Sequence, residues 1–191
     1  MALKLVTPPG VEPVSLAEAK AHARIDHADE DTYVSGLIVA ARRLAEARTG
    51  RSFISQTWRL TLDAFPPGDE ICLARGPVQS VAYVKTFDAD DIESILDPAR
   101  YVVDGESRPP RIVRKPELSW PFVGRAAEGV EIQYVAGYGA AASDVPEELR
   151  QAILMLTAHF YEQREILSEN RLYEAPGAID ALLAPYAPVR I

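Results

Sequence analysis

Carboxylates and one histidine are the side chains of this sequence whose types could support acid–base catalysis. Asp63, Asp104 and Glu131 lie in a segment that we expect to be rich in strands. Two carboxylates held close together can serve a hydrolase as general acid and general base. His159 lies among apolar residues of an expected helix, where it could act as a general base or pack as a hydrogen-bonded core or interface histidine. A small intracellular enzyme of hydrolase type is therefore one alternative, which requires these groups to converge in a pocket.

Two short clusters contain the residue types that metal ions bind. His22 and Asp26 are four residues apart on one expected helix face, and His27 follows them. Two solvated polar side chains near a helix end explain the same spacing without a metal. The segment 88–91 (DADD) begins like a calcium-binding loop but lacks the glycine and the glutamate at the required offsets. We therefore expect an acidic turn there, and no metal or cofactor in the protein.

Cys72 is the only cysteine, so the chain can form neither an intramolecular disulfide nor a cysteine-rich metal site. A nucleophilic cysteine would need a histidine and a polarising partner beside it. The flanking residues 70–74 have the pattern of a strand, which favours a buried structural thiol. The sequence also lacks the motifs of nucleotide phosphate binding, zinc proteases and serine hydrolases.

The balance of charge argues against a nucleic-acid-binding role. The formal net charge is −8 and the pI is about 4.9. Affinity for the phosphate backbone comes largely from Lys and Arg that displace counterions, so an acidic chain is a poor nonspecific binder. A DNA-binding regulator would also need a basic recognition helix. No apolar run reaches the roughly 18 residues of a membrane helix, and the N-terminus has no signal core, so we expect folding in a cytoplasm.

The periodicity of apolar residues predicts an α+β fold, with a helical core and an inserted antiparallel β region. Helices are expected over residues 16–25, 31–49, about 145–167 and 178–183. Ser15 and Glu18 match a capping box before the first helix, and Gly50 ends the second. The third helix is apolar around so much of its circumference that we expect it to be buried on more than one side, as the central element of the fold.

Between residues 56 and 139 apolar residues recur at every second position, which is the pattern of strands. Trp58, Leu60 and Leu62 face one way in an expected strand whose other residues are polar. Further strands are expected at 70–73, 78–87, 101–103, 110–114 and 130–136. Runs this short with tight turns between them predict antiparallel hairpins. We expect one domain over residues 1–191, with a helical core at 16–50 and 145–184, a β-rich insertion at 56–139 and an extended tail at 185–191.

These segments, taken in order, resemble the head–tail connector proteins of HK97-type phages and the related adaptors of gene transfer agents. The resemblance is carried by residues 6–9 (VTPP), 14–26 (VSLAEAKAHARID), 29–31 (DED), 45–51 (AEARTGR), 56–66 (QTWRLTLDAFP), 76–81 (GPVQSV), 134–139 (YVAGYG), 145–153 (VPEELRQAI), 159–165 (HFYEQRE) and 182–186 (LLAPY). Residues 88–128 match only loosely. The resemblance implies a structural virion protein without catalytic residues.

The same resemblance implies a ring of identical subunits, typically twelve, at the head–tail junction of a phage-like particle. Such a ring docks beneath the portal protein on one side and on a stopper or tail-completion protein on the other, and the genome passes through it. Twelve copies at −8 each would carry a formal charge of about −96. A negative lumen repels phosphate, as a conduit for DNA requires. Another interaction protein is the remaining alternative.

Two sets of residues are candidates for contacts in such a ring. By resemblance, we expect the C-terminal part of the chain to contact the portal. The residues chosen for that contact are Leu172, Tyr173, Leu182, Leu183, Tyr186 and Ile191. For the subunit interface we expect Arg42, Arg43 and Trp58 to contribute. The adjacent arginines are either a basic surface for an acidic neighbour or a solvated helix face.

Overall fold

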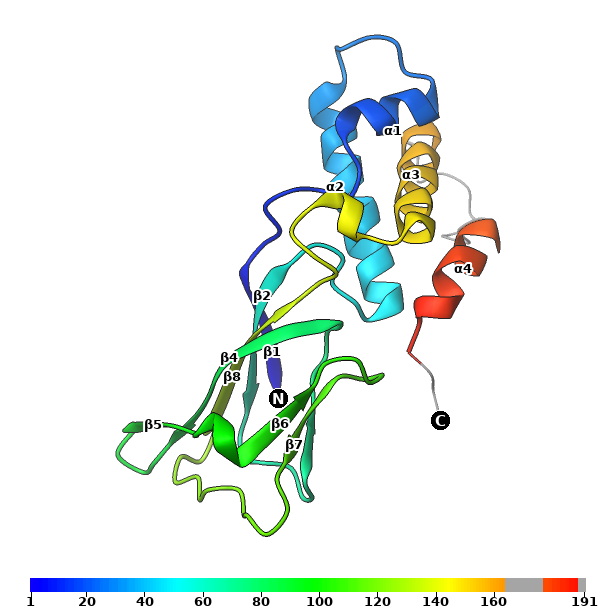
Figure 1. Ribbon diagram of the computed structural model, residues 1–191. Helices are drawn as coiled ribbons and strands as arrows, with labels where there is room; N and C mark the ends of the chain where they lie inside the picture. The colour runs from blue at the N-terminus through cyan, green and yellow to red at the C-terminus, as the bar shows by residue number, and fades with distance from the viewer. Residues whose placement is uncertain (164–176, 189–191) are drawn as a thin grey trace, which may run out of the picture. The chain divides into compact units, whose positions relative to one another are not determined.

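The computed structural model describes residues 1–163 and 177–188. These residues form two compact units, which Figure 1 shows coloured along the chain. The β unit consists of residues 1–9 and 55–138, and the helical unit consists of residues 10–54 and the described residues from 139 onward. The chain therefore passes from one unit to the other three times. The boundaries lie close to the expected helical core and β-rich insertion, but the first nine residues join the β unit.

The central element of the helical unit is its third helix. The unit contains α1 (Leu16–Ala23), α2 (Asp31–Thr49), α3 (Glu147–Glu162) and α4 (Gly177–Leu183), with 3-10 turns η2 (Ala142–Asp144) and η3 (Ala184–Tyr186). Helix α3 packs against each of the other three helices, as its wide apolar face predicted. The buried apolar residues of α2, α3 and α4 include Val34, Ile38, Ala41, Ala45, Leu149, Ala152, Ile153, Leu156, Ile179 and Leu183. Their burial stabilises helices that would be marginal alone.

Local hydrogen bonds define the ends of the first two helices. Ser15 Oγ accepts from the Glu18 backbone N–H at 3.2 Å, and Glu18 Oε2 accepts from the Ser15 backbone N–H at 2.7 Å. This confirms the predicted capping box. Gly50 ends α2 in the left-handed conformation, with φ at 65°, and its N–H donates to Glu46 O. The sequence therefore fixes these boundaries locally.

The β unit contains two antiparallel sheets. Its strands are β1 (Ala2–Thr7), β2 (Gln56–Leu62), β3 (Glu70–Cys72), β4 (Val78–Phe87), β5 (Glu93–Ile95), β6 (Tyr101–Asp104), β7 (Arg111–Arg114) and β8 (Val130–Ala136), with a 3-10 turn η1 (Pro98–Arg100). The larger sheet has the order β1-β2-β8-β4-β5, and the smaller has the order β3-β7-β6. Every neighbouring pair of strands is antiparallel, as the short runs predicted. The α+β class is confirmed.

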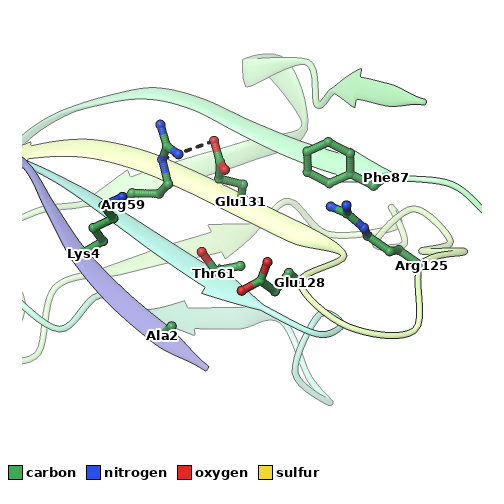
Figure 2. A pocket seen from close by; sticks show the side chains of 8 residues that line it. All are labelled: Ala2, Lys4, Arg59, Thr61, Phe87, Arg125, Glu128 and Glu131. Carbon is green, nitrogen blue, oxygen red and sulfur yellow. Dashed lines mark ion pairs between the residues drawn. The ribbon is translucent and has the colours of Figure 1, made fainter. Parts of the chain in front are cut away.

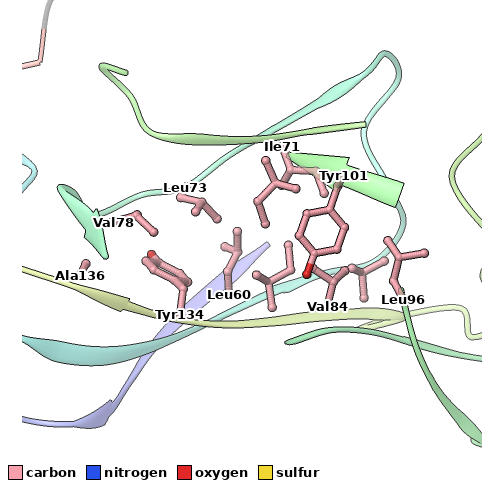
Figure 3. Close-up of a cluster of buried hydrophobic side chains, with 12 residues drawn as sticks. Leu60, Ile71, Leu73, Val78, Val84, Leu96, Tyr101, Tyr134 and Ala136 are labelled. Carbon is pink, nitrogen blue, oxygen red and sulfur yellow. The ribbon is translucent and has the colours of Figure 1, made fainter. Parts of the chain in front are cut away.

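The core of the β unit contains side chains from both sheets. Leu60, Ile132 and Val84 come from three adjacent strands of the larger sheet in one cross-strand row. Ile71 and Ile112 are paired in the smaller sheet, and all five are buried in one apolar cluster, shown in Figure 3. Alternate residues of β8 are buried and half-buried, so one face of the larger sheet packs inward and the other remains accessible.

Several elements differ from the prediction. Strands β1 and β5 were not predicted, and the first was expected only as extended chain. Helix α3 ends at Glu162, whereas its apolar pattern predicted an end near residue 167; residues 164–167 lie outside the described part. Residues 185 and 186 of the expected tail belong to η3, which begins at Ala184. None of the helices in the described ranges has both the length and the apolar composition to cross a membrane.

Candidate functional site

A shallow hollow lies on the accessible face of the larger sheet. Figure 2 shows its lining, which comes from β1, β2, the end of β4, β8 and the segment leading into β8. The lining residues are Ala2, Lys4, Arg59, Thr61, Phe87, Arg125, Glu128 and Glu131. Three cations and two carboxylates in one hollow could hold a polar or charged partner.

Of the three carboxylates weighed for the hydrolase alternative, only Glu131 lines this hollow, and neighbouring side chains contact it. Tyr83 Oη donates to Glu131 Oε1 at 2.5 Å, and Arg59 Nε lies 3.5 Å from the same oxygen. Burial, followed by this hydrogen bond, raises the pKa of the Tyr83 hydroxyl. Glu131 therefore acts as an acceptor in a cross-strand polar cluster.

The other two carboxylates lie elsewhere in the β unit. Asp63 is exposed after β2 and accepts from the Glu128 backbone N–H at 3.0 Å. Asp104 lies on β6 in the smaller sheet, where Arg111 Nε is 3.1 Å from its Oδ2. Although partial desolvation opposes the effect, hydrogen bonds from Arg111 and the Ser107 backbone lower the pKa of Asp104. The structure does not bring the three carboxylates together.

The residues weighed as metal ligands have ordinary structural surroundings. His27 Nε2 lies 4.0 Å from Glu30 Oε2 in the helical unit. Asp88 Oδ1 accepts from the backbone N–H groups of Asp90 and Ile92, each at 2.9 Å, which makes segment 88–92 an acidic turn. Within residues 1–163 and 177–188, no group of three or more His, Cys, Asp or Glu side chains could hold a metal ion.

His159 lies in the helical unit, whereas Cys72 lies in the β unit opposite Arg111, which forms ion pairs with Glu70 and Asp104. His159 is half-buried near the end of α3, and its ring centroid is 6.2 Å from that of Phe160. The expectation of a buried Cys72 is wrong, because the thiol is exposed. Ile71 takes the inward position of β3, so the alternation of the strand turns Cys72 outward.

Arg42, expected at a subunit interface or on a solvated helix face, is buried inside the helical unit. Its Nε lies 2.7 Å from Glu12 Oε2, and its Nη1 lies 2.8 Å from Glu46 Oε2. Although desolvation by burial opposes the effect, the hydrogen bonds to Glu12 and the charge of Glu46 together raise the pKa of Arg42. Its side chain is only 5% exposed, so it cannot offer a basic surface to a neighbour. Arg43, the next residue, is exposed and can.

Trp58 is half-buried on β2 and packs against the apolar cluster of the β unit. The Arg75 guanidinium lies over its ring, 5.3 Å from the centroid. Part of this ring thus stays accessible for an assembly contact.

The C-terminal residues expected at the portal divide into three groups. Leu182 and Tyr186 are half-buried, whereas Leu183 is buried in the helical core and is 3% exposed. Leu172, Tyr173 and Ile191 lie outside the described residues. Two polar contacts join α4 and η3 to the rest of the helical unit. Arg48 Nη1 forms an ion pair with Asp180 Oδ1 at 2.7 Å, and Tyr186 Oη donates a hydrogen bond to Glu148 Oε2 at 3.1 Å. The Leu183 side chain therefore packs in the core of its own helical unit.

The sequence reading missed an exposed apolar surface on the β4–β5 hairpin. Ile92 and Ile95 are 61% and 63% exposed, and Phe122, on another loop of the same unit, is 92% exposed. The isoleucines inside the acidic segment 88–97 could have indicated the hairpin from sequence, because β-branched apolar residues within a polar segment favour a strand or a contact surface.

Comparison with known proteins identifies relatives over nearly the whole chain. A family model described as "Head completion protein" matches residues 13–173. Similar solved structures include chains from "Neck of empty GTA particle computed with C6 symmetry" (29% identity, TM-score 0.86), "Virion of native gene transfer agent (GTA) particle" (28%, 0.85) and "Neck of native GTA particle computed with C12 symmetry" (28%, 0.83). Each match covers 100% of this chain and 97% of the other. A search of curated proteins finds no match.

Proposed function

This chain belongs to the head completion protein family, and from that premise we propose that it is a head–tail adaptor. In this role the chain is a structural subunit of a phage-like particle, either a phage or a gene transfer agent. Identical copies form a ring beneath the portal, join the head to the tail and let DNA pass.

The likeness to particle necks over the full chain length is the observation that carries the proposal. It includes both the β unit and the helical unit, since 100% of this chain and 97% of the neck chain are covered. A neck with C12 symmetry consists of copies related by rotation about one axis. A twelve-membered ring is therefore the assembly that we propose for this chain.

The charge of the chain supports a role as a conduit. A ring of acidic subunits repels the phosphate backbone, so DNA slides past without being held. The net charge of −8 per copy provides this repulsion without any specific binding site. Engaged carboxylates such as Glu131, which the Tyr83 hydroxyl and Arg59 contact, fit a structural role better than a hydrolytic one.

We propose that the C-terminal part of the chain contacts the portal, and the burial of its residues decides which variants can test this contact. Truncation before Pro176 would remove α4 and with it the buried Ile179 and Leu183. Leu182→Asp tests the portal contact with less damage to the fold, because Leu182 is half-buried and the variant keeps the buried Ile179 and Leu183. We expect Leu182→Asp to weaken co-sedimentation with portal rings, whereas Ala178→Asp, at an exposed position of α4, should not. Equal binding of both variants and the wild type would argue against this surface.

The function itself is tested by removing the protein from particle assembly. Cells that lack it should accumulate DNA-filled heads and separate tails, visible by electron microscopy of purified particles. Supplying the wild-type chain should restore joined particles. Heads that still join tails without this protein would refute the adaptor role.

A further inference from the structure

We infer that neighbouring copies in the ring meet edge to edge, with the acidic β4–β5 hairpin of one copy against the basic β1 edge of the next. This inference rests on the proposed ring and names the surface through which a second copy binds. It concerns the larger sheet of the β unit, whose two edges within the described residues are β1 and β5. An edge strand presents backbone N–H and C=O groups that a further strand can pair with.

The two edges lie at the same level along the sheet. Following the strand register, Ala2 on β1 is in one cross-strand row with Ile95 on β5. The intervening members of that row are Thr61, Glu131 and Lys85. All neighbours are antiparallel, so β1 and β5 run in the same direction. Rotation about an axis along the strands would therefore bring β5 of one copy beside β1 of the next without a shift in level.

The β1 edge carries positive charge. Lys4 lies directly opposite Arg59 on β2, and like charges in such a cross-strand pair repel each other. Glu131 is 3.5 Å from Arg59, but among the described atoms Arg59 Nε forms no hydrogen bond although it is buried. The segment 1–7 contains no carboxylate, and its Lys4 is exposed. A neighbour that supplies acidic groups here would relieve the repulsion.

The opposite edge has the complementary charge. Residues 88–97 contain five acidic side chains and no Lys or Arg, namely Asp88, Asp90, Asp91, Glu93 and Asp97. Between these acids, Ile92 and Ile95 are more than half exposed. The β1 side offers apolar area as well, since Val6 is 40% exposed. Two of these acids form ion pairs within the chain, Glu93 with Lys85 at 2.8 Å and Asp91 with Arg125 at 2.9 Å. The remaining acids, Asp88, Asp90 and Asp97, give this edge a net negative charge, opposite to that of Lys4 on the β1 edge.

This arrangement is the kind of interface that a closed ring needs. A rotational ring of more than two copies uses two different surfaces per subunit, which must complement each other. The two edges of one sheet meet that requirement, whereas the smaller sheet has no comparable pair: exposed Val102 lies on β6, and Glu70 and Cys72 are exposed on β3. Opposite charges at the two edges also exclude the wrong pairings of β1 with β1 and of β5 with β5.

Cysteine cross-linking in assembled particles tests the inference. Ala2→Cys and Ile95→Cys are introduced together in a Cys72→Ser background, because Cys72 is exposed. Within one chain the two positions are separated by four strand spacings, about 19 Å along the sheet, so a short bis-maleimide can bridge them only between chains. We expect a ladder of covalent oligomers up to a closed ring. Either single-cysteine variant should give no species above a dimer.

The outcomes separate this inference from the proposed function. Particles with intact necks but no ladder would overturn the edge contact and leave the adaptor role standing. Joined particles that form without the protein would refute the adaptor role itself. Charge reversal gives an independent readout: Lys4→Glu should reduce incorporation into necks, and Asp90→Lys in the same chain should restore it, because Asp90 is exposed in the acidic segment. Equal incorporation of all these variants would also overturn the edge contact.

Discussion

Arg42 and Glu46 form a buried ion pair one turn apart on α2, with Arg42 Nη1 2.8 Å from Glu46 Oε2. Arg42 also donates twice to Glu12, and Glu46 Oε1 accepts from the Phe53 backbone N–H at 2.9 Å. The pair therefore connects three segments of the helical unit: the chain before α1, helix α2, and the chain after α2. A buried charge is tolerated in this way, because each group has several hydrogen-bond partners.

Arg42→Ala should lower the free energy of unfolding by about 3–5 kcal/mol, because it leaves the Glu12 and Glu46 carboxylates without their cation. Denaturant unfolding followed by far-ultraviolet circular dichroism reports on the helical unit and measures this loss. Arg43→Ala is the matched control: its side chain is the exposed neighbour, and its effect should stay within about 0.5 kcal/mol. Similar losses for both variants would contradict the buried network.

Ser15→Ala removes the side-chain acceptor of the capping box at α1 and should cost about 1 kcal/mol of unfolding free energy. The same circular dichroism measurement applies. Ser35→Ala serves as a control, because Ser35 is exposed within α2 and donates only to the Asp31 carbonyl one turn earlier. A loss at Ser35 as large as that at Ser15 would argue against a specific capping effect.

Glu18 should make the stability of the helical unit depend on pH. The hydrogen bond from the Ser15 backbone, helped by Arg150, lowers the pKa of Glu18 below its ordinary value of 4.5. The stabilisation is therefore present above the unfolded pKa and disappears as the pH falls through the folded pKa. Glu18→Gln should be less stable than the wild type at pH 7, and the difference should shrink in unfolding experiments below pH 4.5. A difference that does not change with pH would exclude this linkage.

Local patterns predicted most of the fold, and the elements that they missed depend on distant partners. The capping box at Ser15, the end of α2 at Gly50 and the alternation of β8 are each encoded within a few residues. Strand β1 becomes a strand only because β2, more than fifty residues later, pairs with it. Strand β5 has three residues, too few for a period of two to be recognised.

The candidate assembly residues were harder to predict because burial of a charge depends on tertiary partners. Arg42 looks like a surface residue by type, since arginine is seldom fully buried. Its partner Glu12 lies 30 residues away, and no spacing rule predicts that pair. Cys72 was placed on the wrong face by one residue, because β3 is too short for its alternation to set the register.

Two variants of Tyr134 separate what its buried ring contributes to the free energy of unfolding from what its hydroxyl contributes. Burial on β8 raises its pKa to about 12. The backbone of Ala74 and Arg75 lies near the hydroxyl, but no group in the described ranges meets it with hydrogen-bond geometry. Tyr134→Phe should therefore change the unfolding free energy by less than about 1 kcal/mol, whereas Tyr134→Ala should cost about 3–5 kcal/mol.

Tryptophan fluorescence during denaturant unfolding measures both Tyr134 variants, because Trp58 and Trp120 belong to the β unit. A loss above about 2 kcal/mol for Tyr134→Phe would show that the hydroxyl is satisfied in the folded protein.

Gly139 and Gly36 should respond to alanine with opposite signs. A Cβ at Gly139 would lie 2.1 Å from Asp144 Oδ2 and 2.5 Å from Asp144 Cβ, while Asp144 is held by a hydrogen bond from the Ala141 N–H at 2.8 Å. Gly139→Ala should therefore cost more than about 1 kcal/mol. A Cβ at Gly36, within α2, meets nothing within 4 Å, so Gly36→Ala should stabilise the helix by up to about 1 kcal/mol. Thermal unfolding of both variants checks the pair, and stabilisation by both would mean that Asp144 moves aside without cost.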